Sequence, residues 1–251
     1  MMLYVPGNYI TATTLSSVSS EDTPYYGKEN MYDKNQGLPW GMTAKTNQYA
    51  VWDLGASRPT IICILNHNFT SAVTLTLKAD NNPPNWGAPA WSQALTYHET
   101  NIYYVFSQNY RWWRLEISDG TNPVLPKVGE IVLYTYGSFA MNYKYPFIQR
   151  KTREVDENVS HYGKRWRRKR AVKMAYELDF DAVTDANLAG EVEDFFDAVD
   201  GENPVVFVPE STETICFYVD VLNELDAKRN FENLNAFSLS LEEQSRGIDL
   251  L

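Results

Sequence analysis

Cysteine and histidine are scarce in this sequence, which has two cysteines and three histidines among 251 residues. A structural zinc site needs about four soft ligands close together, and this set does not supply them. Cys63 and Cys216 each lie inside an apolar, strand-like run. This setting favours two buried thiols, made in a reducing compartment, over a disulfide or a shared metal. We therefore expect no metal and no cofactor.

Long apolar runs are also missing. No stretch approaches the roughly 20 apolar residues that a membrane-spanning helix needs, and segment 1–7 lacks the basic region that opens a secretion signal. We expect neither membrane insertion nor a signal peptide. The 44% hydrophobic and 22% charged content is that of a folded protein, so a mainly disordered chain is excluded.

Charge divides the chain into three blocks. The net charge is −2 over residues 1–137, +7 over residues 138–170 and −15 over residues 171–251, for a total of −10. An asymmetry of this kind bears on binding partners rather than on the fold. The basic block has its centre in one run: Lys164, Arg165, Trp166, Arg167, Arg168, Lys169 and Arg170.

This basic run continues directly into a strand pattern. Taken alone, cationic residues with an aromatic suggest nucleic-acid binding. From Val172 to Phe180, however, every second residue is apolar, which predicts a half-buried strand. A strand over 165–180 would span on the order of 50 Å, far more than usual. Because the whole chain is acidic, we expect the overrunning end to lie on the acidic domain of a second copy rather than on nucleic acid.

Residues 138–251 are predicted to form an α+β domain, an antiparallel sheet with one helix. Thr184 or Asp185 is a good helix cap, and strand patterns follow at 204–208, 215–221 and 237–241. The helix is expected to bury one stripe: Leu188, Val192, Phe195, Phe196 and Val199. Its acidic residues are better suited to a solvated or docking surface than to catalysis: Glu191, Glu193, Asp194 and Asp197.

This layout resembles the ring-forming domain of tailed-phage distal tail and minor tail proteins. The resemblance covers roughly residues 150–245 and depends on a few patterns. They are Trp166, Tyr-Glu-Leu-Asp-Phe at 176–180, Phe195 and Phe196 with Gly201, Pro-Val-Val-Phe-Val at 204–208, and Phe-Ser-Leu-Ser-Leu-Glu-Glu at 237–243. It implies a closed ring of copies that also contacts other tail proteins, in a virion made in the host cytoplasm. A head-to-tail ring joins different patches of identical subunits, which suits a basic arm and an acidic body.

Residues 1–137 are predicted to form a β-sandwich. Strand-like runs dominate, and loops rich in glycine, proline and asparagine separate them. The runs are 49–54, 60–65, 73–77, 101–106, 111–117 and 128–136. Trp52, Trp112 and Trp113 are expected to pack, with Arg114 paired to a carboxylate such as Asp53.

The order of motifs in this half resembles the discoidin, or galactose-binding-like, jelly roll. The motifs are Asn-Met-Tyr-Asp at 30–33, Trp40, Trp-Asp-Leu-Gly at 52–55, Tyr-Arg-Trp-Trp at 110–113 and Val-Gly-Glu-Ile at 128–131. The resemblance implies ligand contacts from loops at one end of the sandwich. The candidates are Asp33, Asn35, Trp40, Trp86 and Trp91, since tryptophan beside amide and carboxylate groups commonly holds sugars. The alternative is that these tryptophans cap the core or lie in a contact between subunits.

The sequence therefore predicts a mainly β, non-enzymatic, homo-oligomeric tail component whose jelly roll contacts host glycans or neighbouring tail proteins. The interface is expected to include the basic run from 164 to 170. One alternative is a carbohydrate-binding module for cell-envelope glycans with no role in assembly. Another is a glycosidase, although no pair among the 32 carboxylates stands out.

Overall fold

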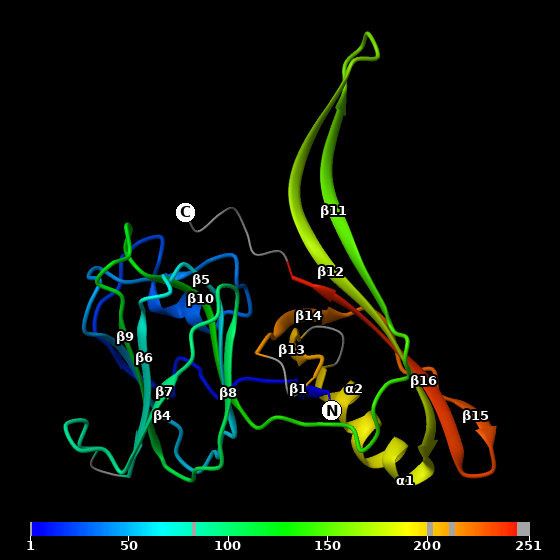
Figure 1. The fold of residues 1–251 in the computed structure, drawn as a ribbon, viewed down its shortest axis with the longest axis horizontal. Coiled ribbons are helices and arrows are strands. Elements are labelled where there is room, and N and C mark those ends of the chain that lie inside the picture. Colours follow the sequence, from blue (N-terminus) through cyan, green and yellow to red (C-terminus); the bar gives the residue numbers. More distant parts are fainter. Residues whose placement is uncertain (1, 82–83, 200–202, 211–213, 245–251) are drawn as a thin grey trace.

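The computed structural model describes residues 2–81, 84–199, 203–210 and 214–244. Its strands form two β-rich units side by side, an N-terminal sandwich and a C-terminal sheet with a short helix against it (Figure 1). A long two-stranded ribbon projects from the C-terminal unit. The predicted fold class, mainly β with a sandwich followed by an α+β unit, is confirmed.

The sandwich consists of two antiparallel sheets. Their strand orders are β3–β10–β5–β8 and β2–β4–β9–β6–β7. The strands are β2 (Leu15–Val18), β3 (Trp40–Gly41), β4 (Gln48–Asp53), β5 (Ile61–His67), β6 (Thr74–Asp80), β7 (Trp91–Leu95), β8 (Ile102–Val105), β9 (Trp112–Ser118) and β10 (Lys127–Tyr134). Every predicted run coincides with one of these strands, whereas β2, β3 and β7 lie outside the predicted runs.

Alternation along β9 separates the core from the surface. Trp113, Leu115 and Ile117 are buried, and the residues between them are half-buried on the outer face. The predicted packing role of Trp52 and Trp113 is confirmed, because both are fully buried in the sandwich core.

The predicted pairing of Arg114 with a carboxylate is confirmed, but the partner is Glu116 and not Asp53. Asp53 lies opposite Trp112 in the strand register, whereas Arg114 lies opposite Val51, so Arg114 is displaced along the strand. Its Nε atom is 3.0 Å from a carboxylate oxygen of Glu116, and its guanidinium lies 4.0 Å from the ring centroid of Tyr49. The side chain that binds Asp53 is Arg111, through two bonds of 2.6 and 2.7 Å.

The C-terminal sheet has the strand order β1–β13–β14–β16–β12–β11, with β15 paired to β16. Its strands are β1 (Leu3–Val5), β11 (Ile148–Val159), β12 (Arg165–Thr184), β13 (Val205–Val208), β14 (Phe217–Val221), β15 (Lys228–Phe231) and β16 (Leu234–Glu243). The long predicted strand is confirmed as β12, and the three later predictions match β13, β14 and β16. Strands β1, β11 and β15 were not predicted.

The helical segment begins where the sequence indicates. The Thr184 hydroxyl caps it by accepting a 3.2 Å hydrogen bond from the backbone N–H of Asn187. The segment runs through α1 (Asp185–Asn187), a π-helical turn (Leu188–Val192) and α2 (Glu193–Val199). The stripe is confirmed, since Val192, Phe195 and Val199 are buried against the sheet. Gly201 lies outside the described residues.

A third hydrophobic cluster joins the two units. Strand β5 is buried along its whole length. Ile62 and Ile64 belong to the sandwich core, whereas Ile61 and Cys63 pack with residues of β1, β13 and β14, and with Cys216. Both thiols are free and buried, as predicted, and burial raises the pKa of Cys63.

A buried amide also crosses this boundary. The side chain of Asn101 is fully buried, and its carbonyl oxygen accepts a 2.9 Å bond from the backbone N–H of Asn66. Its amide nitrogen donates a 2.8 Å bond to the backbone oxygen of Cys216. A buried polar group without a hydrogen-bond partner lowers the stability of the fold. This bridge therefore favours one arrangement of the two units.

The chain passes between the two units twice. Strand β1 leaves the sandwich segment to pair with β13. Tyr4 and Gly137 exchange backbone hydrogen bonds of 2.9 and 2.8 Å, so the two crossing segments lie side by side. A Cβ atom on residue 137 would lie 2.4 Å from the Tyr4 ring, so this close approach requires glycine. The predicted division between residues 137 and 138 stays a prediction, and Leu3–Val5 belong to the sheet of the second unit.

Candidate functional site

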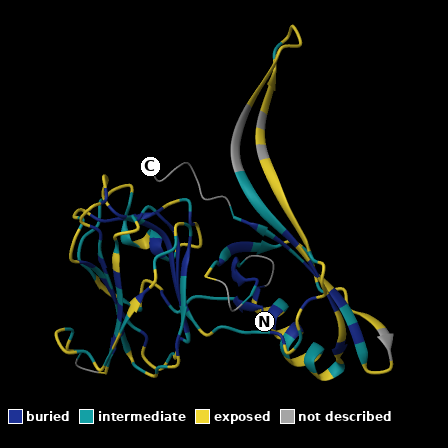
Figure 2. Ribbon diagram, in the orientation of Figure 1, coloured by how far each residue is buried: buried dark blue, intermediate teal, exposed yellow. Residues whose placement is uncertain are grey.

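A long exposed feature of the molecule is the outer part of the β11–β12 ribbon, residues 151–174, here called the arm. Strand β12 pairs with β16 only from Ala175 onward, so the outer half of β12 pairs with β11 alone. Side chains from 151 to 167 that the structure describes are exposed, apart from half-buried Ser160 (Figure 2). An isolated two-stranded hairpin is marginally stable in water. Within the described residues, the arm is therefore held by one strand pair and by no third strand.

The turn at the end of the arm has a defined conformation. Three hydrogen bonds of 2.8 to 3.0 Å join Ser160 to Gly163 and Lys164. Gly163 adopts φ of +76°, a left-handed conformation that suits glycine. This turn presents Tyr162 with 95% of its surface exposed. A large aromatic held out in this way is typical of a contact residue rather than of a core residue.

The two faces of the arm carry different side chains. Arg165 and Arg167 lie opposite Val159 and Glu157 on one face, whereas Trp166 lies opposite Asn158 on the other. Trp166 is 53% exposed, and the ammonium of Lys164 is 5.7 Å from its ring centroid. One face is therefore an ion-paired ladder, and the other presents an indole beside a cation.

Part of the predicted positive charge is neutralised within the arm. The two carboxylate oxygens of Glu157 lie 3.4 Å from Arg165 Nε and 2.9 Å from Arg167 Nε. The side chains of Arg168, Lys169 and Arg170 lie outside the described residues. The run predicted as an interface thus lies on the arm, and its contact with a second copy stays a prediction.

Two of the predicted sugar-contacting tryptophans pack on the sandwich core. Trp40 is fully buried, and its indole N–H donates a 3.0 Å bond to the backbone oxygen of Ser20. Trp91 is half-buried and packs against Trp113 and Phe106. The alternative given above, that these rings complete the core, holds for both, because β3 and β7 place them against the sandwich interior.

The other three candidates lie on two different elements. Trp86 is half-buried, and its ring centroid is 5.8 Å from the guanidinium of Arg114 on β9. Asp33 and Asn35 are exposed, and their side chains accept hydrogen bonds from the backbone of the same turn. The neighbouring residue Lys34 bonds to Asn203 of the C-terminal unit. The five candidates therefore do not form one described cluster.

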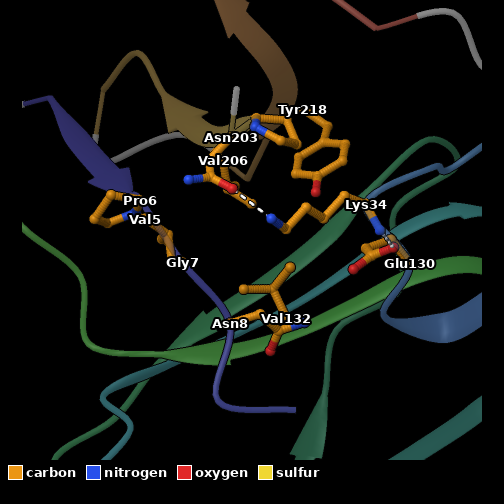
Figure 3. Close-up of a pocket in the computed structure, with 11 residues that line it drawn as sticks. Val5, Pro6, Gly7, Asn8, Lys34, Glu130, Val132, Asn203, Val206 and Tyr218 are labelled. Atoms are coloured by element: carbon orange, nitrogen blue, oxygen red, sulfur yellow. Dashed lines mark hydrogen bonds between the residues drawn. The ribbon is translucent and has the colours of Figure 1, made fainter. Parts of the chain in front are cut away.

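A cavity of about 200 Å³ lies between the two units, and sequence reasoning missed it (Figure 3). The ammonium of Lys34 bridges it to Asn203, and the Tyr218 hydroxyl points toward Lys34 and Glu130. The backbone N–H of Lys34 donates a 3.1 Å bond to the Glu130 carboxylate. The lining residues are Val5, Pro6, Gly7, Asn8, Lys34, Glu130, Val132, Asn203, Pro204, Val206 and Tyr218.

Glu130 is the buried ionisable group of this cavity, with 1% of its surface exposed. Burial raises its pKa well above the usual value, and the nearby charge of Asp33 adds to the rise. Burial also raises the pKa of Tyr218, and the charge of Glu130 contributes. The signal was present in the sequence as a glutamate inside a strand pattern, at Val-Gly-Glu-Ile, but the strand that would cover it from the other unit was not evident.

The chain is similar to several solved structures over about half of its length. No family model matches the chain, and no curated protein matches it. Among solved structures, a variant of chitosan-binding module 1 from the chitosanase/glucanase of Paenibacillus sp. IK-5 is 15% identical, with a TM-score of 0.41, over 52% of this chain and 98% of that one. A CBM32 module of Clostridium perfringens is also 15% identical, with a TM-score of 0.39, over 51% and 98%. CBM32 of AlyQ, solved with 4,5-unsaturated mannuronic acid, is 15% identical, with a TM-score of 0.35, over 47% and 92%.

The described residues contain neither a metal-binding cluster nor a candidate membrane-spanning helix. No cluster of three or more histidine, cysteine, aspartate or glutamate side chains is placed to hold a metal ion. No helix in the described part of the chain is long and apolar enough to cross a membrane.

Proposed function

We propose that this protein is a non-catalytic structural component of a virion tail, whose copies join into a ring through the arm. The observation that carries the proposal is the arm itself. It extends beyond its own sheet, has a defined turn, and exposes Tyr162 and Trp166 at its end. Other tail proteins would be its further partners.

An exposed two-stranded ribbon offers its strand edges to other chains. Within the described residues, the edge of β12 that has left β16 has no third strand beside it, and open strand edges promote association with other chains. Exposed aromatic residues supply much of the binding energy at protein interfaces. A nucleic-acid partner is disfavoured, because Arg165 and Arg167 already share Glu157 and the whole chain has a net charge of −10.

Removal of the two aromatic side chains tests this proposal. We expect wild-type protein to form a defined multimer in mass photometry, and Tyr162→Ala with Trp166→Ala to remain a folded monomer. These positions are preferable to the arginines, because reversing Arg165 would also repel Glu157 inside the arm. Tyr25→Ala is the control, since Tyr25 is 78% exposed on the sandwich. A monomeric wild type, or a double variant that assembles normally, would contradict the proposal.

A second candidate function is recognition of cell-envelope glycans by the sandwich. The observation that favours it is an aromatic and polar group on the outer face of β9. The Arg114 guanidinium lies 4.0 Å from the ring centroid of Tyr49 and 5.8 Å from that of Trp86. Arg114 also lines a hollow of about 150 Å³ together with Gln48, Thr74, Thr76, Glu116 and others. Stacking rings beside polar groups suit a sugar. The two functions are compatible in one protein.

Glycan binding has its own test. Titration with chitosan oligosaccharides and with 4,5-unsaturated mannuronic acid should show saturable binding, which Trp86→Ala weakens by roughly tenfold or more. Trp166→Ala lies in the other unit and should leave this binding unchanged. If a broad glycan array gives no binding to wild-type protein, this candidate is wrong, and the assembly proposal is unaffected.

A further inference from the structure

A groove of about 510 Å³ lies between α2 and the segment that joins β14 to β15. Clefts of roughly 300–1,000 Å³ hold drug-sized molecules, so this groove has room for an aromatic side chain. Its lining residues are Phe196, Asp197, Val199, Val221, Leu222, Asn223, Glu224 and Leu225. It belongs to the C-terminal unit, on the strongly acidic part of the chain.

The groove wall formed by segment 222–225 is held in place. Asn223 accepts a 2.7 Å bond from the backbone N–H of Ser240 and donates a 2.9 Å bond to the backbone oxygen of Ser238. The backbone N–H of Leu222 donates a further 2.9 Å bond to Ser240. These bonds attach the wall to β16, so the groove exists before any partner arrives.

The lining combines apolar and acidic groups. Leu222 is 60% exposed, although leucine gains from burial, and Phe196 is half-buried beside it in the lining. The charged lining residues are Asp197 and Glu224, and none of the lining residues is cationic. The groove therefore suits a ligand that brings an apolar group and a positive charge together.

We propose that this groove receives the end of the arm from a second copy of this chain, with Trp166 against its apolar lining and Lys164 toward Asp197 and Glu224. The inference rests on the proposed assembly function and names the surface that the arm meets. Trp166 and Lys164 already lie together on the arm, with the Lys164 ammonium 5.7 Å from the Trp166 ring centroid. The indole and the ammonium would therefore enter the groove together. The end of the arm belongs to the block with a net charge of +7, and the groove belongs to the block with a net charge of −15.

The contact must form between copies. In Figure 1 the end of the arm and α2 lie at opposite ends of the C-terminal unit, so an arm does not reach its own groove. Arm and groove are different patches of one chain, which makes the contact head-to-tail. Repetition of such a contact closes into a ring or continues as a filament.

A mixing experiment tests this contact. The groove variant Asp197→Lys with Glu224→Lys should lose assembly, as should the arm variant Tyr162→Ala with Trp166→Ala, each with an association constant reduced by roughly 100-fold or more. Mixed together, the groove variant supplies an intact arm and the arm variant an intact groove. We expect the mixture to form a 1:1 dimer in analytical ultracentrifugation and nothing larger.

The control makes the same charge change away from the groove, at two exposed glutamates, Glu29→Lys with Glu99→Lys, and should assemble like wild type. Circular dichroism confirms that each variant is folded. If the arm variant loses assembly but the groove variant does not, the arm mediates assembly at another surface and this inference is wrong. A mixture that stays monomeric also overturns it. If neither variant affects assembly, the proposed function itself is wrong.

Discussion

Replacement of Phe139 by alanine is expected to lower the free energy of unfolding by about 3–5 kcal/mol. Phe139 is 2% exposed, and its ring centroid lies 5.0 Å from that of Tyr4, 5.3 Å from Phe180 and 5.5 Å from Phe195. The strand β1, the long strand β12 and the helix α2 therefore all pack on this one ring. Removing the ring leaves a cavity that three separate elements would have to close.

Urea unfolding, followed by tryptophan fluorescence and circular dichroism, measures this loss. Phe147→Ala is the matched control, because Phe147 is half-buried and packs mainly on Tyr143 and Tyr145. We expect it to lose about 1 kcal/mol. An equal loss in both variants would mean that Phe139 has no special position in the C-terminal core.

Replacement of Glu130 by glutamine should flatten the dependence of stability on pH. Because burial raises the pKa of Glu130 in the folded state, the folded protein holds a proton that the unfolded chain releases at lower pH. Stability from this residue is fully present below the unfolded pKa, and it is lost as pH rises through the folded pKa. Glutamine is uncharged throughout, so we expect the variant to be more stable than wild type at pH 8, by on the order of 2 kcal/mol.

The measurement is a series of urea unfolding curves from pH 4 to pH 8. Glu99→Gln provides a comparison, since it removes one carboxylate from an exposed position. Parallel stability curves for wild type and Glu130→Gln would show that Glu130 is ionised in the folded protein at ordinary pH. That result would also mean that burial in the cavity between the units does not raise the pKa of Glu130.

The sequence was informative wherever a local pattern decided the structure. Alternating apolar residues from Val172 to Phe180 identified β12, because a strand with one buried face repeats every two residues. Thr184 identified the start of the helical segment, since a hydroxyl there satisfies a free backbone N–H. The two free buried thiols followed from apolar surroundings in the same way.

Features that depend on distant pairing were not predictable from such patterns. Strand β11 is polar and charged, and it becomes a strand only because β12 lies beside it. The arginine partner of Asp53 depended on strand register, and the position of Trp40 depended on which sheet β3 joined. The groove and the cavity each combine segments far apart in the chain, so no local motif contains either of them.

The double crossing of the chain at Tyr4 and Gly137 restricts how the sandwich is oriented on the C-terminal unit. A domain attached by one linker can rotate. A domain that is attached at two adjacent points, and that shares a hydrophobic cluster with its neighbour, keeps a fixed orientation. In a circle of copies, every sandwich would then face outward or inward at the same tilt. The spacing between neighbouring sandwiches would be set by the rigid frame of the subunit, and a ligand with regularly spaced groups could meet several of them at once.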